Sequence, residues 1–283
     1  MTSHETPPRL IATDLDGTLV RDDHTISPRT IAAVRRVMDR DVEVVFVTGR
    51  PPRKMTDIIE SFGGYGTAIC SNGAIVYDLH TGQCATGRFI APEIVAEAAR
   101  LLRALIPGIG IAVEYAHELA ADPWYEPWEW DADVTVRRES DETLFSRPAP
   151  KLLGRHPTLS PDELVDLAAP KLSGLVSVYH SNGSRLLEAI APGVSKAAAL
   201  AALAEQRDIS AAEVAAFGDM PNDLPMLAWA GRSYAVANAH PSVLAAVDEV
   251  IGSNDEDAVA QVLDRYFPAG PVTSHSKEDS VHG

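Results

Sequence analysis

The chain has 283 residues, of which 46% are hydrophobic and 23% are charged, a composition typical of a globular protein long enough for two hydrophobic cores. Its formal net charge of −16 disfavours nucleic acid and anionic membrane surfaces as partners. No apolar run is long enough to cross a bilayer, and the polar start MTSHETPPRL lacks the apolar segment of a secretory signal. Cys70 and Cys84 provide no disulfide framework, so we expect a cytoplasmic protein with two free thiols; the alternative is a single bridge between them.

Strand and helix patterns alternate in the first part of the chain. A short apolar strand at 9–14 precedes an amphipathic helix over 27–40, which begins with a Ser-Pro pair. The β-branched run at 42–48 is typical of a buried parallel strand. Residues 51–63 predict a helix opened by proline and closed by glycine, and 67–78 predict a hairpin around an Asn-Gly turn.

The middle of the chain has more strands than helices, and the alternation then returns. The middle predicts a helix at 92–105, strands around 110–115, 134–138 and 149–155, a helix at 160–172, and strands at 175–181 and 185–191. The last part predicts helices at 195–206, 223–230, 241–247 and 255–267 and strands at 213–219, 233–237 and 249–252.

This order predicts an α/β fold with an insertion. We expect a doubly wound, parallel, Rossmann-like core formed by residues 9–80 and 191–268, with an α+β unit inserted at 81–190. The polar ends, 1–8 and 269–283, have no periodicity and are predicted to be flexible; the tail histidines His275 and His282 are interpreted as solvated.

Polar residues follow several of the predicted core strands. Strand ends in an open α/β sheet meet at one edge, where ligands bind. Those ends carry four acids: Asp14, Asp16, Asp219 and Asp223. Carboxylates that share one site repel each other unless they are protonated or neutralised by a cation, and oxygen ligands of this kind suit Mg²⁺.

Lys196 stands in the first turn of a predicted helix whose N-cap is Ser195. A cation there opposes the helix macrodipole, and broken local rules are enriched at functional sites. A helix N-terminus and an ammonium group together would hold an anion such as phosphate. The alternative is a solvated surface lysine.

Four segments, in order, carry a family resemblance: DLDGTL, VTGR, GVSKAAAL and FGDMPNDLPML. They resemble the four motifs of the haloacid dehalogenase superfamily and, within it, those of the Cof-type (class IIB) phosphatases. The resemblance covers residues 9–80 and 184–265. It implies a Rossmann-like core in which the inserted unit is a C2-type cap.

The resemblance also implies roles for individual residues. Asp14 would be the nucleophile that forms an aspartyl-phosphate, and Asp16 the general acid and base. Mg²⁺ would be held by Asp14, the backbone carbonyl of Asp16 and Asp219, supported by Asn222 and Asp223. Thr48 and Lys196 complete the predicted catalytic set. The predicted substrate-binding set is Gly49, Arg50, Asn72, Gly73 and Lys196.

Several residues have a second interpretation. Asp16 could be a turn carboxylate, and Asp223 an acid at a helix N-terminus. Arg50 either binds substrate or pairs with Asp57 or another surface acid. Asn72 either lies near the substrate or serves the turn alone.

The inserted unit contains no motif that identifies its ligand. Four aromatic residues could line a sugar-binding face or could belong to the unit's own core: Trp124, Tyr125, Trp128 and Trp130. His180, Ser181 and Asn182 are candidate substrate contacts just before the chain re-enters the core. Cys70 is interpreted as a buried small hydrophobe rather than a nucleophile.

The predicted function is that of a Mg²⁺-dependent phosphatase acting on a small phosphorylated metabolite such as a sugar phosphate, as a monomer or homodimer. One alternative is a sugar phosphomutase of the same superfamily. The other is a non-catalytic phosphometabolite-binding protein, which would not need the acid and base chemistry of Asp14 and Asp16.

Overall fold

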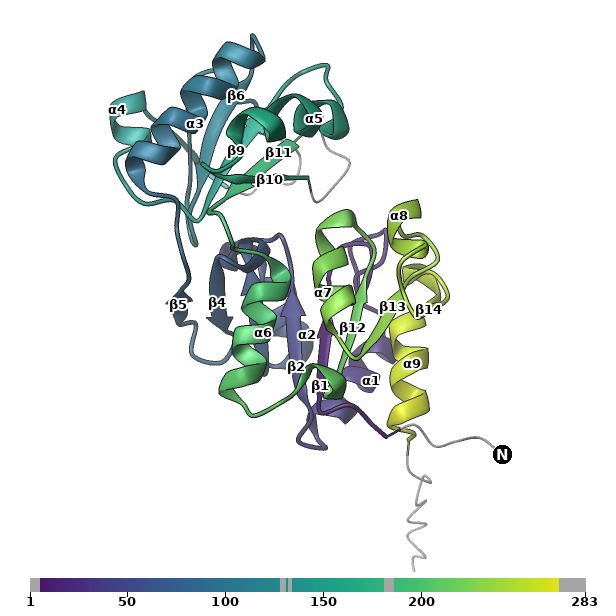
Figure 1. The fold of residues 1–283 in the computed structure, drawn as a ribbon. Helices are drawn as coiled ribbons and strands as arrows, with labels where there is room; N and C mark the ends of the chain where they lie inside the picture. Colours follow the sequence, from purple (N-terminus) through teal and green to yellow (C-terminus); the bar gives the residue numbers. More distant parts are fainter. Residues whose placement is uncertain (1–5, 128–130, 132–133, 181–185, 270–283) are drawn as a thin grey trace, which may run out of the picture.

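The computed structural model describes residues 6–127, 131, 134–180 and 186–269, and two sheets organise this part of the chain. Figure 1 shows the core below and the inserted unit, which we call the cap, above it. The predicted segments 1–5 and 270–283 of the termini lie outside the described residues.

The core sheet has the strand order β14-β13-β12-β1-β2-β3-β4-β5. It is parallel from β14 to β3, whereas β3, β4 and β5 pair antiparallel. Its strands are β1 (Leu10–Thr13), β2 (Glu43–Val47), β3 (Thr67–Cys70), β4 (Ile75–Asp78), β5 (Cys84–Thr86), β12 (Val214–Gly218), β13 (Arg232–Ala235) and β14 (Glu249–Val250). The predicted α/β fold and the predicted hairpin are confirmed. Strand β5 extends the core sheet past residue 80, where we placed the domain boundary.

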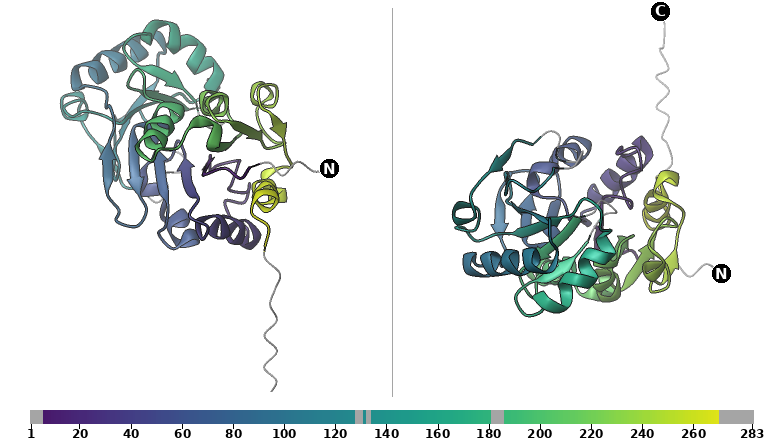
Figure 2. Two further views of the ribbon diagram at one scale, coloured as in Figure 1. Left: turned by 60° about the horizontal axis from the view of Figure 1, so that its bottom comes forward. Right: turned by 90° about the horizontal axis from the view of Figure 1, so that it is seen from above.

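Helices cover both faces of the core sheet (Figure 2). They are α1 (Pro28–Met38), α2 (Thr56–Phe62), α6 (Lys196–Gln206), α7 (Leu224–Trp229), α8 (Pro241–Leu244) and α9 (Ala258–Tyr266). Alternate residues of β1 serve opposite faces: Leu10 packs in one cluster with Leu200 of α6, and Ile11 in another with Val34 of α1. This alternation follows from the two-residue period of a strand.

The helix predicted over 51–63 is shorter than expected. A 3₁₀ turn, η1 (Pro52–Lys54), comes first, and α2 begins only at Thr56. The double proline fixes two φ angles but supplies no N–H groups, so the chain makes one tight turn before the α-helix starts. The helix ends as predicted at Gly63, which adopts the left-handed conformation of a C-terminal cap.

The cap is a second sheet with helices packed against it. The sheet has the order β10-β11-β9-β6-β7-β8 and is antiparallel except for the pair β7–β8. Its strands are β6 (Gly110–Glu114), β7 (Leu119–Ala121), β8 (Val136–Arg138), β9 (Lys151–Arg155), β10 (Ser177–Tyr179) and β11 (Leu186–Ile190). Its helices are α3 (Pro92–Leu105), α4 (Asp141–Leu144) and α5 (Pro161–Leu172). We did not predict β7 or α4, which are only three and four residues long.

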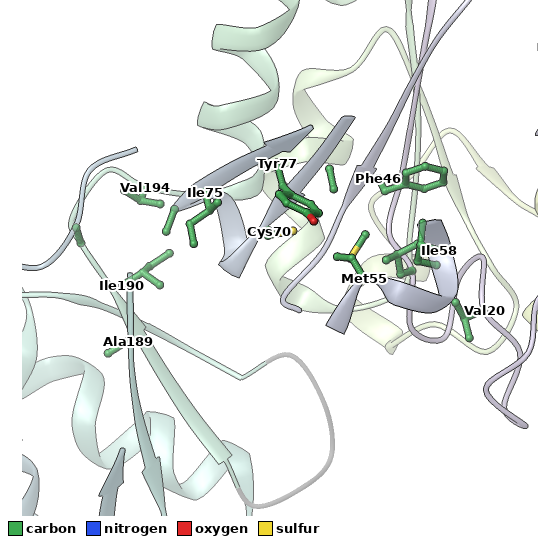
Figure 3. Close-up of a cluster of buried hydrophobic side chains, with 14 of the residues drawn as sticks. Val20, Phe46, Met55, Ile58, Cys70, Ile75, Tyr77, Ala189, Ile190 and Val194 are labelled. Carbon is green, nitrogen blue, oxygen red and sulfur yellow. The ribbon is translucent and has the colours of Figure 1, made fainter. Parts of the chain in front are cut away.

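A single cluster of buried hydrophobic side chains joins the cap to the core. Figure 3 shows Ala189 and Ile190 of β11 beside Val194, with Ile75 and Cys70 of the core hairpin continuing the row. Cys70 is fully buried, which confirms the interpretation as a small hydrophobe, and both cysteines are free thiols. The cap is thus anchored through packed side chains as well as through its two chain connections.

Candidate active site

Asp14 follows β1 at the carboxyl edge of the core sheet. Its backbone N–H donates to the carbonyl of Phe217 in β12 at 3.0 Å, which extends the parallel ladder by one residue. The side chain then lies beside the end of β12, and the residue is 5% exposed. The fold therefore places the predicted nucleophile where strand ends converge.

Lys196 is buried between two of the acids. Its ammonium donates to Asp14 Oδ1 at 2.5 Å and to Asp223 Oδ1 at 2.6 Å, and the residue is 2% exposed. Ser195 caps α6 by accepting a hydrogen bond from Ala198 N–H, as predicted. The interpretation as a solvated lysine is wrong, because two buried carboxylates balance its charge.

Asp219 completes a group of three carboxylates. Side-chain oxygens of Asp14, Asp219 and Asp223 lie within 4.8 Å of one another. Asp219 accepts a hydrogen bond from the Thr18 hydroxyl at 3.0 Å, while Asp223 Oδ2 accepts from the backbone N–H groups of Asp219 and Met220. Asp223 is therefore held by both the lysine and the loop.

The three acids outnumber the single ammonium among them, and the pKa values reflect this. Burial raises the pKa of Asp14 to about 7; Lys196 opposes the rise, and the charges of Asp223 and Asp16 add to it. Burial and the charges of Asp14 and Asp223 raise the pKa of Asp219 well above its usual range. The two carboxylates keep the pKa of Lys196 raised, so the ammonium stays charged. The cluster lacks positive charge.

These residues fit a bound Mg²⁺ ion. Three buried carboxylates supply hard oxygen ligands, and their excess negative charge is what a divalent cation neutralises. Asn222 supports the same reading, because its buried Oδ1 has no hydrogen-bond partner within the described residues. A buried polar atom without a partner costs free energy, and a metal ion or its water would satisfy this one.

Gly17 makes room for the acid cluster. Its φ of +82° lies in the left-handed region, and a Cβ atom there would stand 2.6 Å from Asp219 Oδ2. The turn after Asp16 therefore needs glycine both for its backbone angle and for the space beside Asp219.

Asp16 lies apart from the three-acid cluster. Its carboxylate pairs with Arg50, whose guanidinium also binds Asp57 at 2.9 and 3.0 Å. The predicted ion pair of Arg50 with Asp57 is therefore present, and the pair with Asp16 was not predicted. Arg50 is 5% exposed and lines the central cavity.

Asn72 connects the core to the cap. Its side-chain amide donates to Glu188 of β11, and its Oδ1 accepts from Asn222 at 3.1 Å. Its φ of 55° fits the turn interpretation as well. Gly73 lies against α6 instead: a Cβ atom there would stand 2.3 Å from the carbonyl oxygen of Ser195.

A cavity of about 260 Å³ lies between the core and the cap. From the core it is lined by Asp14, Asp16, Thr48, Gly49, Arg50, Lys196 and Asn222, among others. From the cap it is lined by Glu114, Tyr125, Asp131, Lys151, Leu153, Arg155, Leu186 and Glu188. The cap thus covers the site at the strand ends. The volume of the cavity is at the lower end of the range for ligand pockets, which suits a small metabolite.

Three charged residues that are buried in strands of the cap were missed by sequence reasoning: Glu114, Lys151 and Glu188. Each interrupts an apolar strand, in the segments GIAVEY, APKLLG and LLEAIA. A charge inside an otherwise buried strand is a usable signal, because such residues are rarely buried without partners.

The other cap candidates have mixed outcomes. Tyr125 lines the cavity and is 1% exposed, whereas Trp124 is 73% exposed and does not line it. His180 Nε2 lies 3.0 Å from Asp162 Oδ1 and is also absent from the lining. Trp128, Trp130, Ser181 and Asn182 lie outside the described residues. Among the described helices, none has the length and apolar character that spanning a membrane requires.

The fold and this site agree with a family comparison. Residues 11–263 match the model of the haloacid dehalogenase-like hydrolases. The chain therefore belongs to that family, as the four motifs predicted, and is a hydrolase of the superfamily.

Individual relatives extend the agreement over nearly the whole chain. An HMP-PP phosphatase of Serratia proteamaculans is 28% identical, over 95% of this chain and 99% of its own. A 5-amino-6-(5-phospho-D-ribitylamino)uracil phosphatase of Bacillus subtilis is 27% identical, over 93% and 99%. A solved subclass IIB sugar phosphatase of the superfamily shares the fold, with a TM-score of 0.75 and 20% identity over 91% of this chain and 98% of its own.

Proposed function

We propose that the protein is a Mg²⁺-dependent phosphatase that hydrolyses a small phosphorylated metabolite through an aspartyl-phosphate on Asp14. The observation that carries the proposal is the buried cluster of Asp14, Asp219 and Asp223, in which Lys196 bridges Asp14 and Asp223. Asp14 and Lys196 line the cavity that the cap covers. A site with three carboxylates and one ammonium is poorly suited to an anion by itself, but well suited to a metal ion together with a phosphate group.

Asp14, Asp219 and the backbone carbonyl of Asp16 would hold the ion, with Asn222 and Asp223 in support. When bound, Mg²⁺ would neutralise charge on the transferring phosphoryl group and screen it from Asp14. Lys196 adds a second positive charge at Asp14, which favours the ionised carboxylate that attacks and opposes the effect of burial on its pKa.

In the first step, an Asp14 carboxylate oxygen attacks phosphorus and the bond from phosphorus to the ester oxygen breaks. Asp16, in its protonated form, gives its proton to the leaving oxygen, so an alcohol departs. In the second step, Asp16 takes a proton from water, the water oxygen attacks phosphorus, and the bond to Asp14 breaks. Inorganic phosphate leaves and both carboxyl groups return to their starting state.

The proposal for the substrate class rests on the volume of the cavity and on the names of the relatives. The cavity suits a small metabolite, and the two relatives above are phosphatases of small phosphorylated compounds by name. We propose a sugar phosphate or a compound of similar size. A cytoplasmic location and a monomeric or homodimeric state stay predictions.

The test is a hydrolysis screen of purified protein against phosphorylated sugars, nucleotides and cofactor precursors, with Mg²⁺ and with EDTA. We expect phosphate release that requires Mg²⁺ and disappears in Asp14→Asn but not in Asp166→Asn, which changes an exposed cap acid. Release that persists in EDTA or in Asp14→Asn would contradict the mechanism.

The same screen separates the alternatives. A phosphomutase would convert a sugar phosphate into an isomer without releasing inorganic phosphate. A binding protein would be stabilised against thermal unfolding by a phosphorylated compound without converting that compound. Identifying the carbon-containing products, in addition to assaying inorganic phosphate, distinguishes all three results.

A further inference from the structure

Lys151 is a buried cap residue whose charge reaches the core. It begins β9, is 2% exposed, and its ammonium donates to the carbonyl oxygen of Gly49 at 2.6 Å. Gly49 belongs to the turn Thr48–Gly49–Arg50 that follows β2 and lines the cavity. A side chain of the cap thus hydrogen-bonds directly to the backbone of the predicted phosphate-binding turn.

All three carbonyl groups of this turn are held. The Thr48 carbonyl accepts from Asn72 N–H at 3.0 Å, and the Arg50 carbonyl accepts from Ser71 N–H at 2.9 Å. These two donors belong to the neighbouring core turn, η2 (Ser71–Gly73). The donor to the middle carbonyl, that of Gly49, is Lys151 of the cap.

The middle carbonyl matters because a peptide unit is planar. Fixing the Gly49 carbonyl fixes the N–H of Arg50 on the opposite side of the same peptide. That N–H donates to Thr48 Oγ1 at 3.0 Å. With its oxygen engaged as an acceptor, the Thr48 hydroxyl has its own hydrogen left to donate to a phosphoryl oxygen.

Two carboxylates hold Lys151 in place. Its ammonium lies 3.2 Å from Glu114 Oε2 and 3.3 Å from Glu188 Oε2. Glu114 also pairs with Arg53 at 2.8 Å. Glu188 in turn accepts from Asn72, so the network touches both core turns.

We propose that Lys151 is a positioning residue for phosphoryl transfer. Its ammonium completes the hydrogen bonding of the Thr48–Gly49–Arg50 turn and, through the Gly49–Arg50 peptide and the Arg50 N–H, holds the Thr48 hydroxyl in place for the phosphoryl group. The inference rests on the proposed function. It assigns to the cap a role in the chemical step, separate from any contact with the leaving group.

The first test compares Lys151→Met with the wild type on two substrates that have different leaving groups. Because the phosphoryl group is common to both substrates, kcat/KM should fall by the same factor for each. We expect a loss of about 100-fold, the scale of a misplaced catalytic group. The affinity for orthophosphate, measured by calorimetry with Mg²⁺, should weaken as well. Unequal factors, or an unchanged orthophosphate affinity, would overturn the proposal.

Lys151→Met leaves two buried carboxylates short of a cation, so misfolding must be separated from mispositioning. The double variant Lys151→Met, Glu114→Gln restores the local charge balance without restoring a donor to Gly49. We expect it to recover thermal stability but not kcat/KM. If it recovers kcat/KM, Lys151 only neutralises charge and the proposal fails.

Arg103→Met is the matched control, because it removes a cation from the buried Asp122 elsewhere in the cap. It should lower thermal stability without changing kcat/KM, and a parallel loss of activity would mean that cap stability alone explains the effect. Wild-type hydrolysis tests the proposed function separately. Should the wild type bind orthophosphate without turning over any substrate, the proposed function fails while the orthophosphate comparison still decides the role of Lys151.

Discussion

Both carboxylate oxygens of Asp16 accept hydrogen bonds from the guanidinium of Arg50, at 2.8 and 2.5 Å. This two-point contact fixes the orientation of the proposed general acid, which a single point charge could not do. The side chain of Asp16 remains 39% exposed towards the cavity, whereas that of Arg50 is 5% exposed. The arginine is therefore the fixed partner and Asp16 the accessible one.

Replacing this arginine tests the pairing. In Arg50→Lys the charge stays but the two-point contact is lost, so we expect kcat to fall by about 10-fold, part of the contribution of a positioned acid. Thermal stability should change little, because the charge stays and both carboxylate partners are partly exposed to solvent, which screens the ion pairs. Asp57→Asn, which leaves the Asp16 pair intact, should keep kcat within about threefold. A raised KM with unchanged kcat in Arg50→Lys would instead assign Arg50 to substrate binding.

Metal-free stability should depend on pH in a defined direction. The folded-state pKa of Asp14 is about 7, against 3.8 for the ordinary carboxyl, and that of Asp219 is also raised. The folded state therefore binds more protons than the unfolded state between these values, so the free energy of unfolding should fall as pH rises from about 4 to about 7. Urea titrations in EDTA at several pH values across this interval measure the free energy of unfolding.

Magnesium should reverse that loss. Because protons compete with the ion for the same carboxylates, Mg²⁺ should raise the melting temperature more at pH 8 than at pH 5. Asp219→Asn should abolish most of the Mg²⁺-dependent rise. An equal rise at both pH values would show that the ion binds elsewhere.

Lys196 should matter for stability as well as for activity. Lys196→Met leaves the buried Asp14 and Asp223 without their common cation, and breaking such a pair costs about 3–5 kcal/mol. The loss should be smaller at pH 5 than at pH 8, because protonation of the acids removes the unbalanced charge. Chemical denaturation at the two pH values measures the difference. A loss that does not depend on pH would mean that packing, not charge, explains it.

Gly17→Ala should impair metal binding. The new methyl group would meet Asp219 Oδ2, so we expect the Mg²⁺ concentration for half-maximal activity to rise by about 10-fold or more, the effect of disturbing a metal ligand. Gly174→Ala is the control, since Gly174 has a similar φ of +86° but nothing within 4 Å of the added methyl group. Both variants should lose about 1 kcal/mol of stability from the backbone angle. Only the first should change the Mg²⁺ requirement.

The sequence predicted the core site because its residues stand at strand ends. Asp14, Thr48 and Asp219 each follow an apolar strand, and parallel strands bring their ends to one edge. The separation of Asp16 from the other acids was not predictable in this way, since it depends on the direction of one side chain. Its partner Arg50 was predicted to bind substrate or to pair with Asp57 or another surface acid, and the pair with Asp16 was not predicted.

The cap side of the site could not be predicted from the same rule. Lys151 and Glu114 begin and end neighbouring antiparallel strands, and their meeting depends on the register Glu114↔Lys151. A one-residue change of register would send one of these side chains to the opposite face of the sheet. No turn in the sequence fixes that register, because 36 residues separate the two strands.

The hydrophobic cluster that runs from Ile75 through Val194 to Ile190 has a consequence for engineering. Cap and core share one cluster of buried hydrophobic side chains, so a cap cannot be exchanged between relatives simply by joining it at its two chain connections. A chimaera would need to carry Cys70, Ile75 and Val194 along with the foreign cap, or to redesign them together. Substrate preference is therefore better altered by changing the cavity-facing residues of the cap in place than by exchanging the cap as a whole.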